Sequence, residues 1–496
     1  MRTLIKNALK YPSKTAIIGD NQRYTYAQLL EASASFVSIL LEKTTDLNEK
    51  RVAFMVEPSF DYVTTQWAIW RAGGVTVPLC ITYPLPSLQY VIEDTGAEII
   101  VVTPQYQAIL EDYAHEKGIR FIVLDDNLRS VSNTPKVVLP NITVNRRAMI
   151  LYTSGTTNLP KGVVTTHGNI EAQVSTLVKS WEWSENDHIL CILPLHHVHG
   201  IINVISCALW SGATVEFLPQ FTAEGVLNAF KKGEINLFMA VPTIYFKLIA
   251  AIDPLSIEEK KAVFDMFKKF RLMVSGSAAL PVSVMEKWET ISGHRLLERY
   301  GMTEIGMGIS NPYKGERRAG YIGKPLSGVK ARLVDEQNKV VKRGQAGEIQ
   351  IKGKNVFLEY WQKLEATQKT FTEDGWFKTG DVAVVEKGYY RILGRDSIDI
   401  IKSGGYKISA LEIEEVLRTH PSVSDCSVIG LPDEEWGELV AAVLILKEKE
   451  IDLKELNAWM RQKMPAYKTP RRYHIATELP RNAMGKVTKN DLKKLF

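Results

Sequence analysis

Short apolar runs alternate with helix-like segments along the chain from about Val52 to Pro281. The clearest runs begin at Ile99, Phe121, Ile189, Phe238 and Leu272. Such alternation is typical of βαβ units, in which a helix connects two parallel strands. The pattern therefore predicts an α/β fold whose sheets are flanked by helices.

Small polar residues follow several of these runs. Tyr152 is followed by Thr-Ser-Gly, and Val274 is followed by Ser-Gly-Ser. Open α/β sheets bind their ligands at the carboxyl ends of the strands. We therefore expect a ligand site where these two runs end.

After Gly320 the sequence pattern changes to one that is typical of β-strands. Residues 331–334 and 348–351 alternate as half-exposed strands do, with a polar turn at 335–339 between them. The pattern predicts a small antiparallel β-rich subdomain at about 320–393.

A compact tail of roughly 100 residues follows Arg395. It contains an amphipathic helix pattern from Ala410 to Arg418, strands, and a second helix pattern near residues 453–462. We expect an N-terminal domain at 1–395 and a smaller α+β domain at 396–496.

Composition narrows the class of protein. A chain of 496 residues with 45% hydrophobic and 24% charged residues is typical of a soluble globular protein with more than one core. The 61 basic and 56 acidic residues are spread along the chain, which argues against a nucleic-acid partner. No apolar stretch approaches the ~20 residues of a membrane span, and the first residues do not resemble a signal peptide. We expect a cytoplasmic enzyme of undetermined oligomeric state.

The four cysteines do not suggest a metal centre. Cys80, Cys191, Cys207 and Cys426 lie far apart in the sequence and form no C-x-x-C pair. Buried free thiols are the interpretation that this spacing favours.

A loop rich in glycine and hydroxyl residues follows the run at 148–152. It reads Thr-Ser-Gly-Thr-Thr-Asn-Leu-Pro-Lys-Gly over residues 153–162. Backbone amides, hydroxyl groups and a lysine can together bind a triphosphate. Five residues separate Gly155 from Lys161, so the loop is not a G-x-x-x-x-G-K-[ST] P-loop. The alternative for the loop is an ordinary surface turn.

This loop resembles the signature of the adenylate-forming superfamily, which includes acyl-CoA synthetases, luciferases and peptide-synthetase adenylation domains. Further matching strings occur in the family's order at 193–200, 300–304, 375–381, 394–395, 404–406 and 480–486. Within the superfamily, residues 240–245, 273–281, 293–300 and 399–407 are most similar to malonyl-CoA and methylmalonyl-CoA synthetases. Asn158 stands where the family usually has glycine, and asparagine tolerates the same left-handed backbone.

The resemblance implies binding of ATP with Mg²⁺ and formation of an acyl-adenylate. The residues expected to bind ATP or AMP are Thr153, Ser154, Gly155, Thr156, Thr157, Lys161, Ser277, Ala278, Tyr300, Gly301, Met302, Thr303, Asp381 and Arg395. Glu304, and more weakly Thr153, would coordinate magnesium. Asp381 and Arg395 would hold the ribose hydroxyls, and Tyr300 would stack on adenine. Lys486 would bridge the acyl carboxylate and the α-phosphate.

Three residues are expected to contact the acid: His197, Arg299 and Ser275. His197 and Thr303 would also take part in catalysis. Arg299 stands where an enzyme for fatty acids would need an apolar side chain, so a second substrate carboxylate would pair with it. Two alternatives remain at this point. Arg299 could form a structural ion pair with Glu298 or with an acid distant in the sequence, and His196, His197 and His199 could bind zinc.

The resemblance also implies that coenzyme A is the thiol acceptor and which residues lie along its path. Gly404, Gly405 and Tyr406 match the loop that lines the path of the coenzyme A arm, and Ser397 falls near the family's hinge. The C-terminal domain would rotate about that hinge between the two half-reactions.

The hypothesis that follows is an AMP-forming acid–CoA ligase for a short diacid, malonate or methylmalonate. The alternatives are a ligase for short monocarboxylates, an enzyme that loads a carrier-protein phosphopantetheine, and a catalytically silent homologue.

Overall fold

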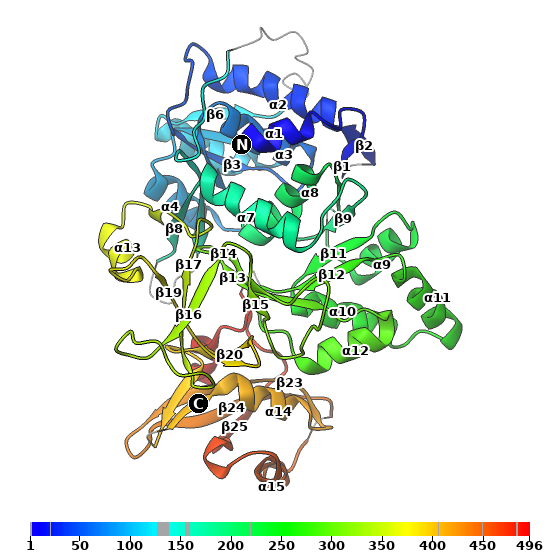
Figure 1. The fold of residues 1–496 in the computed structure, drawn as a ribbon, viewed down its shortest axis with the longest axis vertical. Helices are drawn as coiled ribbons and strands as arrows, with labels where there is room; N and C mark the ends of the chain where they lie inside the picture. The colour runs from blue at the N-terminus through cyan, green and yellow to red at the C-terminus, as the bar shows by residue number, and fades with distance from the viewer. Residues whose placement is uncertain are drawn as a thin grey trace.

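The computed structural model describes residues 2–19, 21–125, 138–153, 159–218, 220–404, 406–448, 450–482 and 485–496. Two large sheets form the upper part of the molecule, and two smaller sheets lie below and beside them (Figure 1). The α/β class expected from the alternating pattern is confirmed.

The larger sheet has nine strands in the order β15-β14-β13-β12-β11-β9-β10-β1-β2. Its strands are β1 (Thr15–Gly19), β2 (Gln22–Thr25), β9 (His188–Cys191), β10 (Thr214–Phe217), β11 (Leu237–Ala240), β12 (Leu272–Ser275), β13 (Leu297–Met302), β14 (Gly306–Ser310) and β15 (Lys324–Pro325). The run from β13 to β1 is parallel, whereas β2, β14 and β15 join antiparallel at the two ends.

The second sheet has seven strands in the order β18-β8-β7-β4-β3-β5-β6. They are β3 (Arg51–Met55), β4 (Val75–Pro78), β5 (Ile99–Val102), β6 (Arg120–Val123), β7 (Arg147–Thr153), β8 (Lys161–Thr166) and β18 (Glu359–Tyr360). Strands β7 and β8 form an antiparallel hairpin, and the loop predicted to bind phosphate connects them.

Helices cover and separate these sheets, as Figure 1 shows for α10, α11 and α12 beside β11 and β12. In this part of the chain they are α1 (Arg2–Ala8), α2 (Tyr26–Leu41), α3 (Phe60–Arg71), α4 (Leu85–Thr95), α5 (Gln107–Glu116), α7 (His167–Ser180), α8 (Cys207–Ser211), α9 (Ala223–Lys231), α10 (Pro242–Ile252), α11 (Ile257–Phe267) and α12 (Val282–Ser292). Every residue from Tyr62 to Trp70 in α3 is buried, because this helix contacts both large sheets. The Tyr62 hydroxyl donates to Leu195 O at 2.5 Å, and Trp70 Nε1 donates to Ala148 O at 2.7 Å.

The predicted β-rich subdomain is an antiparallel sheet in the order β16-β17-β19-β20. Its strands are β16 (Lys330–Val334), β17 (Gly347–Lys352), β19 (Phe377–Glu386) and β20 (Tyr389–Arg395), with α13 (Leu364–Thr370) before β19. Asp381 on β19 lies opposite Arg395 on β20, which places both side chains at one corner of the sheet.

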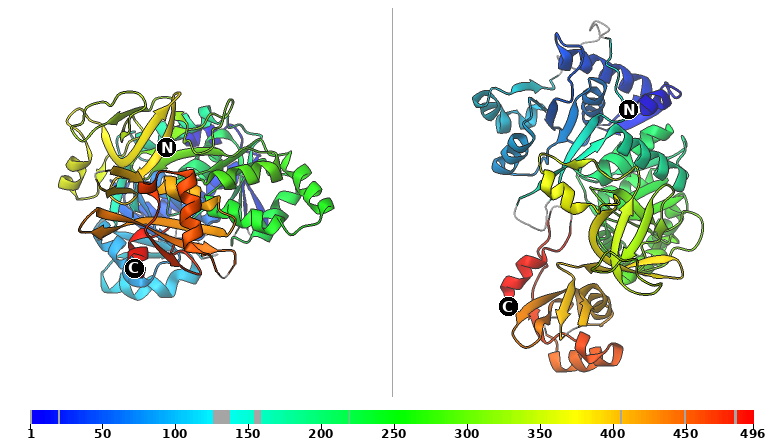
Figure 2. Two further views of the ribbon diagram at one scale, coloured as in Figure 1. Left: turned by 90° about the horizontal axis from the view of Figure 1, so that it is seen from below. Right: turned by 60° about the vertical axis from the view of Figure 1, so that its left-hand side comes forward.

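The fourth sheet lies at the C-terminal end of the chain and at the bottom of Figure 1. It contains β21 (Ile400–Ser403), β22 (Tyr406–Ser409), β23 (Val423–Asp433), β24 (Gly437–Leu446) and β25 (Arg472–Ile475). Helices α14 (Ala410–Arg418) and α15 (Leu453–Lys463) pack on it around a separate apolar cluster, and α16 (Lys489–Leu492) follows. The right-hand view of Figure 2 shows this sheet set apart from the large sheets, with the red C-terminal end of the chain beside it.

Two features were not predicted from the pattern of apolar residues. Residues His199–Ser206 form a buried π-helix, η2, and the strands at the ends of the large sheets run antiparallel. Both depend on tertiary contacts, whereas the local pattern indicates only where strands and helices occur. Among the described residues, each helix is too short or too polar to cross a membrane.

Candidate active site

The stem of the predicted phosphate loop is a β-hairpin. Thr153 at the end of β7 pairs with Lys161 at the start of β8. The Lys161 ammonium group lies 5.2 Å from the centre of the Tyr360 ring, which is a cation–π contact. The predicted ligands Ser154, Gly155, Thr156 and Thr157, with Asn158, lie outside the described residues. The two ends of the loop therefore place a hydroxyl group and a cation side by side.

Glu304 lies in the turn between β13 and β14. Its Oε1 accepts a hydrogen bond of 2.9 Å from the Tyr360 hydroxyl, and burial raises the pKa of its carboxyl group. Tyr360 thereby connects Glu304 with Lys161. Among the described residues there is no cluster of three His, Cys, Asp or Glu side chains that could hold a metal alone. One carboxylate near the phosphate loop fits Mg²⁺, which takes most of its ligands from phosphate and water.

Asp381, Arg395 and Tyr300 meet at a second corner of the site. The Tyr300 hydroxyl donates to Asp381 Oδ2 at 2.6 Å, and Arg395 Nε donates to Asp381 Oδ1 at 3.0 Å. Asp381 and Tyr300 are buried. Three residues predicted to bind the nucleoside are thus brought together, and the phenol of Tyr300 is fixed by Asp381.

Lys486 reaches this site from the C-terminal end of the chain. A Cβ atom on the preceding Gly485 would lie only 3.1 Å from Thr243 Oγ1, so the loop lies against the start of α10. The side chain of Lys486 retains an exposed surface, although it lies near Arg395, Asp381, Arg299 and Glu304. This partial burial, followed by the charge of Arg395, lowers the pKa of Lys486.

His199 is buried, His196 and His197 are partly buried, and among the described residues they form no group that could hold a metal. The rings of His196 and His197 lie 4.0 Å apart, and burial, His196 and Lys486 lower the pKa of His197 to about 3. His199 Nδ1 lies 3.2 Å from Oγ of Ser277, a residue held at φ 70°. His197 is therefore neutral at pH 7 and can contact an anion only through hydrogen bonds.

Arg299 is 3% exposed, and its Nε and Nη2 lack hydrogen-bond partners among the described residues. Burial lowers the pKa of Arg299 to about 9, which leaves the guanidinium charged at neutral pH. Glu298 does not pair with it, because Glu298 Oε1 accepts from Leu280 N at 3.1 Å and burial raises the Glu298 pKa to about 8. Neighbouring residues of a strand point to opposite faces, which explains this separation. The structural ion pair with Glu298 considered above is therefore absent.

Glycine at position 276 makes room for this guanidinium. A Cβ atom on Gly276 would lie 2.4 Å from Arg299 Cζ and 2.6 Å from Arg299 Nε. Ser275, just before it at the end of β12, is fully buried, and its hydroxyl lacks a described partner. The guanidinium, with its unpaired Nε and Nη2, lies near His199, whose pKa is lowered first by burial and then by the charge of Arg299. Buried donors without partners are what an anion pocket requires.

The remaining predicted residues lie at the edges of the site. Gly301 and Met302 end β13, and Thr303 follows in the turn before Glu304. Ala278 follows Ser277, and Ser397 lies in the exposed turn after β20.

The predicted acceptor loop is only partly described. Gly404 adopts φ 55°, and the Tyr406 ring is 56% exposed and stacks on Tyr467 with ring centres 4.5 Å apart. Gly405 lies outside the described residues. The loop therefore presents an accessible aromatic surface.

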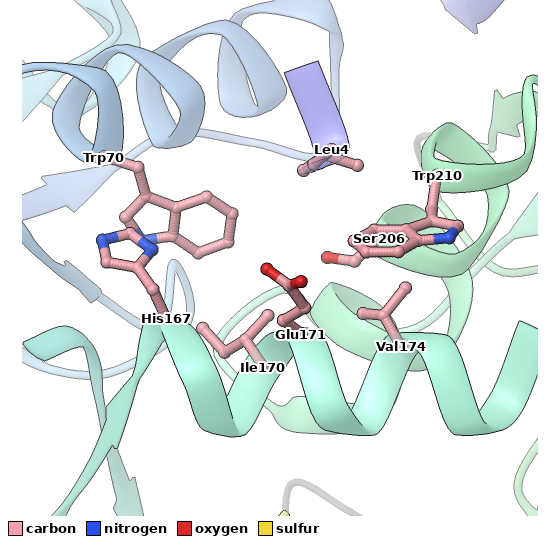
Figure 3. Close-up of a pocket in the computed structure, with 8 residues that line it drawn as sticks. All are labelled: Leu4, Trp70, His167, Ile170, Glu171, Val174, Ser206 and Trp210. Carbon is pink, nitrogen blue, oxygen red and sulfur yellow. The ribbon is translucent and has the colours of Figure 1, made fainter. Parts of the chain in front are cut away.

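One enclosed cavity lies elsewhere, between α1, α7 and α8 (Figure 3). It is lined by Leu4, Trp70, His167, Glu171, Ser206 and Trp210, among others, and has a volume of about 10 Å³. That volume holds about one water molecule. The cavity is too small for a substrate.

Two family models match the chain. The AMP-binding enzyme model covers residues 4–361, and the model of the AMP-binding enzyme C-terminal domain covers residues 412–486. The chain belongs to the AMP-binding enzyme family. The resemblance inferred from the loop at 153–162 is confirmed.

Individual relatives extend over nearly the whole chain. It is 44% identical to the mitochondrial malonate–CoA ligase ACSF3 of Bos taurus, covering 97% of this chain and 88% of that protein. It is 40% identical to the malonate–CoA ligase of Arabidopsis thaliana, with 97% and 86% covered. ATP-bound MatB from Rhodopseudomonas palustris superposes with a TM-score of 0.91 at 32% identity, covering 99% of this chain and 98% of that one.

Sequence reasoning missed two residues of this site, Gly276 and Tyr360, and the contact of the predicted residue Ser277 with His199. Gly276 lies within the matching string 273–281, but only the structure shows which side chain it accommodates. Tyr360 carries no motif of its own, and its role follows from the pairing of β18 with β8.

We expect Gly276→Ala to displace the Arg299 guanidinium and raise the KM for an anionic acid, with little change in folding. The clash involves the end of a long side chain, so the fold can adjust. Steady-state kinetics and thermal melting measure both effects. Gly19→Ala is the matched control, because a Cβ atom there meets only Phe217 at 3.9 Å. An unchanged KM in Gly276→Ala would contradict the placement of the pocket.

Proposed function

We propose that this protein is an ATP-dependent malonate–CoA ligase that forms malonyl-adenylate and then malonyl-CoA, AMP and pyrophosphate. Membership of the family and the names of the relatives support the ligase reaction. The observation that supports a diacid is the buried guanidinium of Arg299, whose Nε and Nη2 lack hydrogen-bond partners among the described residues.

The first half-reaction joins two anions. One malonate carboxylate attacks the α-phosphorus of ATP, and pyrophosphate leaves. We assign Lys486 to bridge the attacking carboxylate and the α-phosphate, where negative charge develops in the transition state. Lys161 and the hairpin at 153–161 hold the leaving phosphates, and Glu304 with Thr153 would hold Mg²⁺, which neutralises phosphate charge.

The other residues orient the two substrates. Asp381 and Arg395 position the ribose, with Tyr300 beside the adenine. Neutral His197 and Ser275 contact the acid by hydrogen bonds and add no repulsive or attractive charge near the reacting carboxylate. Arg299 pairs with the second carboxylate of malonate, which a monocarboxylate lacks. A short monocarboxylate would leave the buried cation uncompensated, at substantial cost.

The second half-reaction needs a different arrangement at the same site. The thiol sulfur of CoA attacks the acyl carbonyl carbon, and AMP leaves. Because Lys486 lies near Arg395, Asp381 and Glu304, we take the present arrangement as the one for adenylation. We infer a domain boundary at Arg395, with residues 396–496 turning about Ser397 so that Gly404, Gly405 and Tyr406 line the path of the thiol.

We expect Arg299→Ala to lower kcat/KM for malonate by a factor of a hundred or more, because losing one partner of a buried ion pair costs ~3–5 kcal/mol and ~1.4 kcal/mol is tenfold. The variant should still convert butyrate, because butyrate has no second carboxylate to pair with the guanidinium. CoA-dependent AMP release with each acid measures the two values.

The matched control for that experiment is Arg295→Ala. Arg295 lies near Arg299 in the sequence but already pairs with Glu289 at 2.6 Å. It should leave the preference between the two acids unchanged. Equal losses on malonate and butyrate in Arg299→Ala would show that Arg299 has only a structural role.

We expect Lys486→Ala to lower malonate-dependent ATP–pyrophosphate exchange by about 10²–10³, the usual effect of removing one preorganised electrostatic group. Transfer of the acyl group to CoA from supplied malonyl-adenylate should be retained. Lys493→Ala changes an exposed lysine of the same tail and serves as control. Loss of both half-reactions in Lys486→Ala would rule out the assigned role.

We propose a cytoplasmic location. The four cysteines are free and buried, as in proteins of reducing compartments. The bovine relative is named as mitochondrial. Fractionation of cells that express the tagged chain should recover it in the cytosol, and recovery with an organelle would contradict this part of the proposal.

A further inference from the structure

A second lysine, Lys489, follows Lys486 by three residues and has entirely different surroundings. Lys486 is exposed, whereas Lys489 is only 9% exposed. Lys489 Nζ lies 2.7 Å from Asp399 Oδ1 and 2.9 Å from Glu414 Oε1. Both contacts are ion pairs between the ammonium group and a carboxylate. One ammonium group therefore holds two carboxylates together within the protein.

Both carboxylates are fixed by the backbone around them. Glu414 is 4% exposed, and its Oε1 also accepts a hydrogen bond of 2.8 Å from Val428 N on β23. Asp399 Oδ2 accepts from Arg395 N at 3.0 Å, while Asp399 N donates to Arg395 O at 2.7 Å. Glu414 thus connects α14 with β23, and Asp399, in the turn between β20 and β21, is held to the backbone of Arg395 at the end of β20.

The loop at 480–488, which carries Lys486, is closed by backbone hydrogen bonds. Asn482 N donates to Lys486 O and Thr488 N donates to Pro480 O, both at 2.9 Å. On the other side of this loop, Arg481 pairs with Asp425 at 2.7 Å, but both side chains are partly exposed and solvent weakens the pair. Lys489 is therefore the buried anchor of the loop, and a shift of Lys489 would also move Lys486.

We propose that Lys489 is a positioning residue for adenylation. Its ion pairs with Asp399 and Glu414 hold the loop so that Lys486 reaches the reacting carboxylate and the α-phosphate. Asp399 ties the same anchor to the backbone of Arg395, where we place the domain boundary, so the path of the chain after Arg395 and the position of Lys486 are set together. This inference rests on the adenylation role proposed for Lys486.

The charges support this assignment. Burial opposes the charged form of Lys489, but Glu414 and Asp399 outweigh it and hold the Lys489 pKa above its ordinary value. The lysine is thus charged at any pH at which the enzyme works. Its removal would leave two buried carboxylates with one fewer cation between them, although Arg418 still lies 3.5 Å from Glu414.

The test uses the full-length chain with Lys489→Met, which removes the charge and keeps an extended side chain. Malonate-dependent ATP–pyrophosphate exchange and CoA transfer from supplied malonyl-adenylate are measured separately. We expect exchange to fall on the order of a hundredfold, the loss that a misplacement of about 1 Å can cause, with transfer to CoA unchanged. Lys489→Arg should restore part of the exchange, because a guanidinium can pair with both carboxylates.

Lys494→Met is the matched control, since Lys494 is exposed and pairs with Asp491 at the surface. It should leave both half-reactions unchanged. If Lys489→Met does not fold, Glu414→Gln is measured instead. We expect it to lower ATP–pyrophosphate exchange by a smaller factor and to leave transfer to CoA unchanged. Unchanged exchange, or equal loss of both half-reactions in a folded variant, would overturn the inference. If Lys486→Ala separates the half-reactions and Lys489→Met does not, only this inference fails; if Lys486→Ala does not separate them, the proposed function fails first.

Discussion

The guanidinium of Arg299 is the group on which the account of specificity depends. It is a charged side chain held inside the protein with two nitrogen atoms that lack partners among the described residues. A buried charge is costly unless an opposite charge compensates it. Gly276 leaves room for it, and Glu298 on the opposite face of β13 does not neutralise it. The architecture therefore maintains an anion-binding position before any substrate is present.

The rest of the site arranges charge around a reaction between two anions. Lys161 approaches from β8 and Lys486 from the loop before α16, while His197 stays neutral and does not compete for the carboxylates. Asp381 is already paired with Arg395 and Tyr300, so it does not repel the phosphates as a free anion would. Because Lys486 comes from the loop between β25 and α16, the charge that it contributes depends on where the C-terminal part of the chain lies.

The sequence was informative wherever a motif or a period determines the local structure. The strands at 99–102 and 272–275, the helix at 410–418 and the antiparallel sheet after residue 320 follow from periodicity, and all occur as predicted. That Asp381, Arg395 and Lys486 belong to one site was expected from matching strings, whereas the ion pair between Asp381 and Arg395 was not. The partners of Lys489, the role of Gly276 and the link from Glu304 through Tyr360 to Lys161 could not be predicted, because each joins segments far apart in the sequence that only the fold brings together.

A crystal structure with a non-hydrolysable malonyl-adenylate analogue would test the central claim most directly. The account expects the free carboxylate of the malonyl group within about 3.2 Å of Arg299 Nε or Nη2, the range of a charge-assisted hydrogen bond. A free carboxylate directed to solvent, with Arg299 still unpaired or paired to a protein acid, would contradict it.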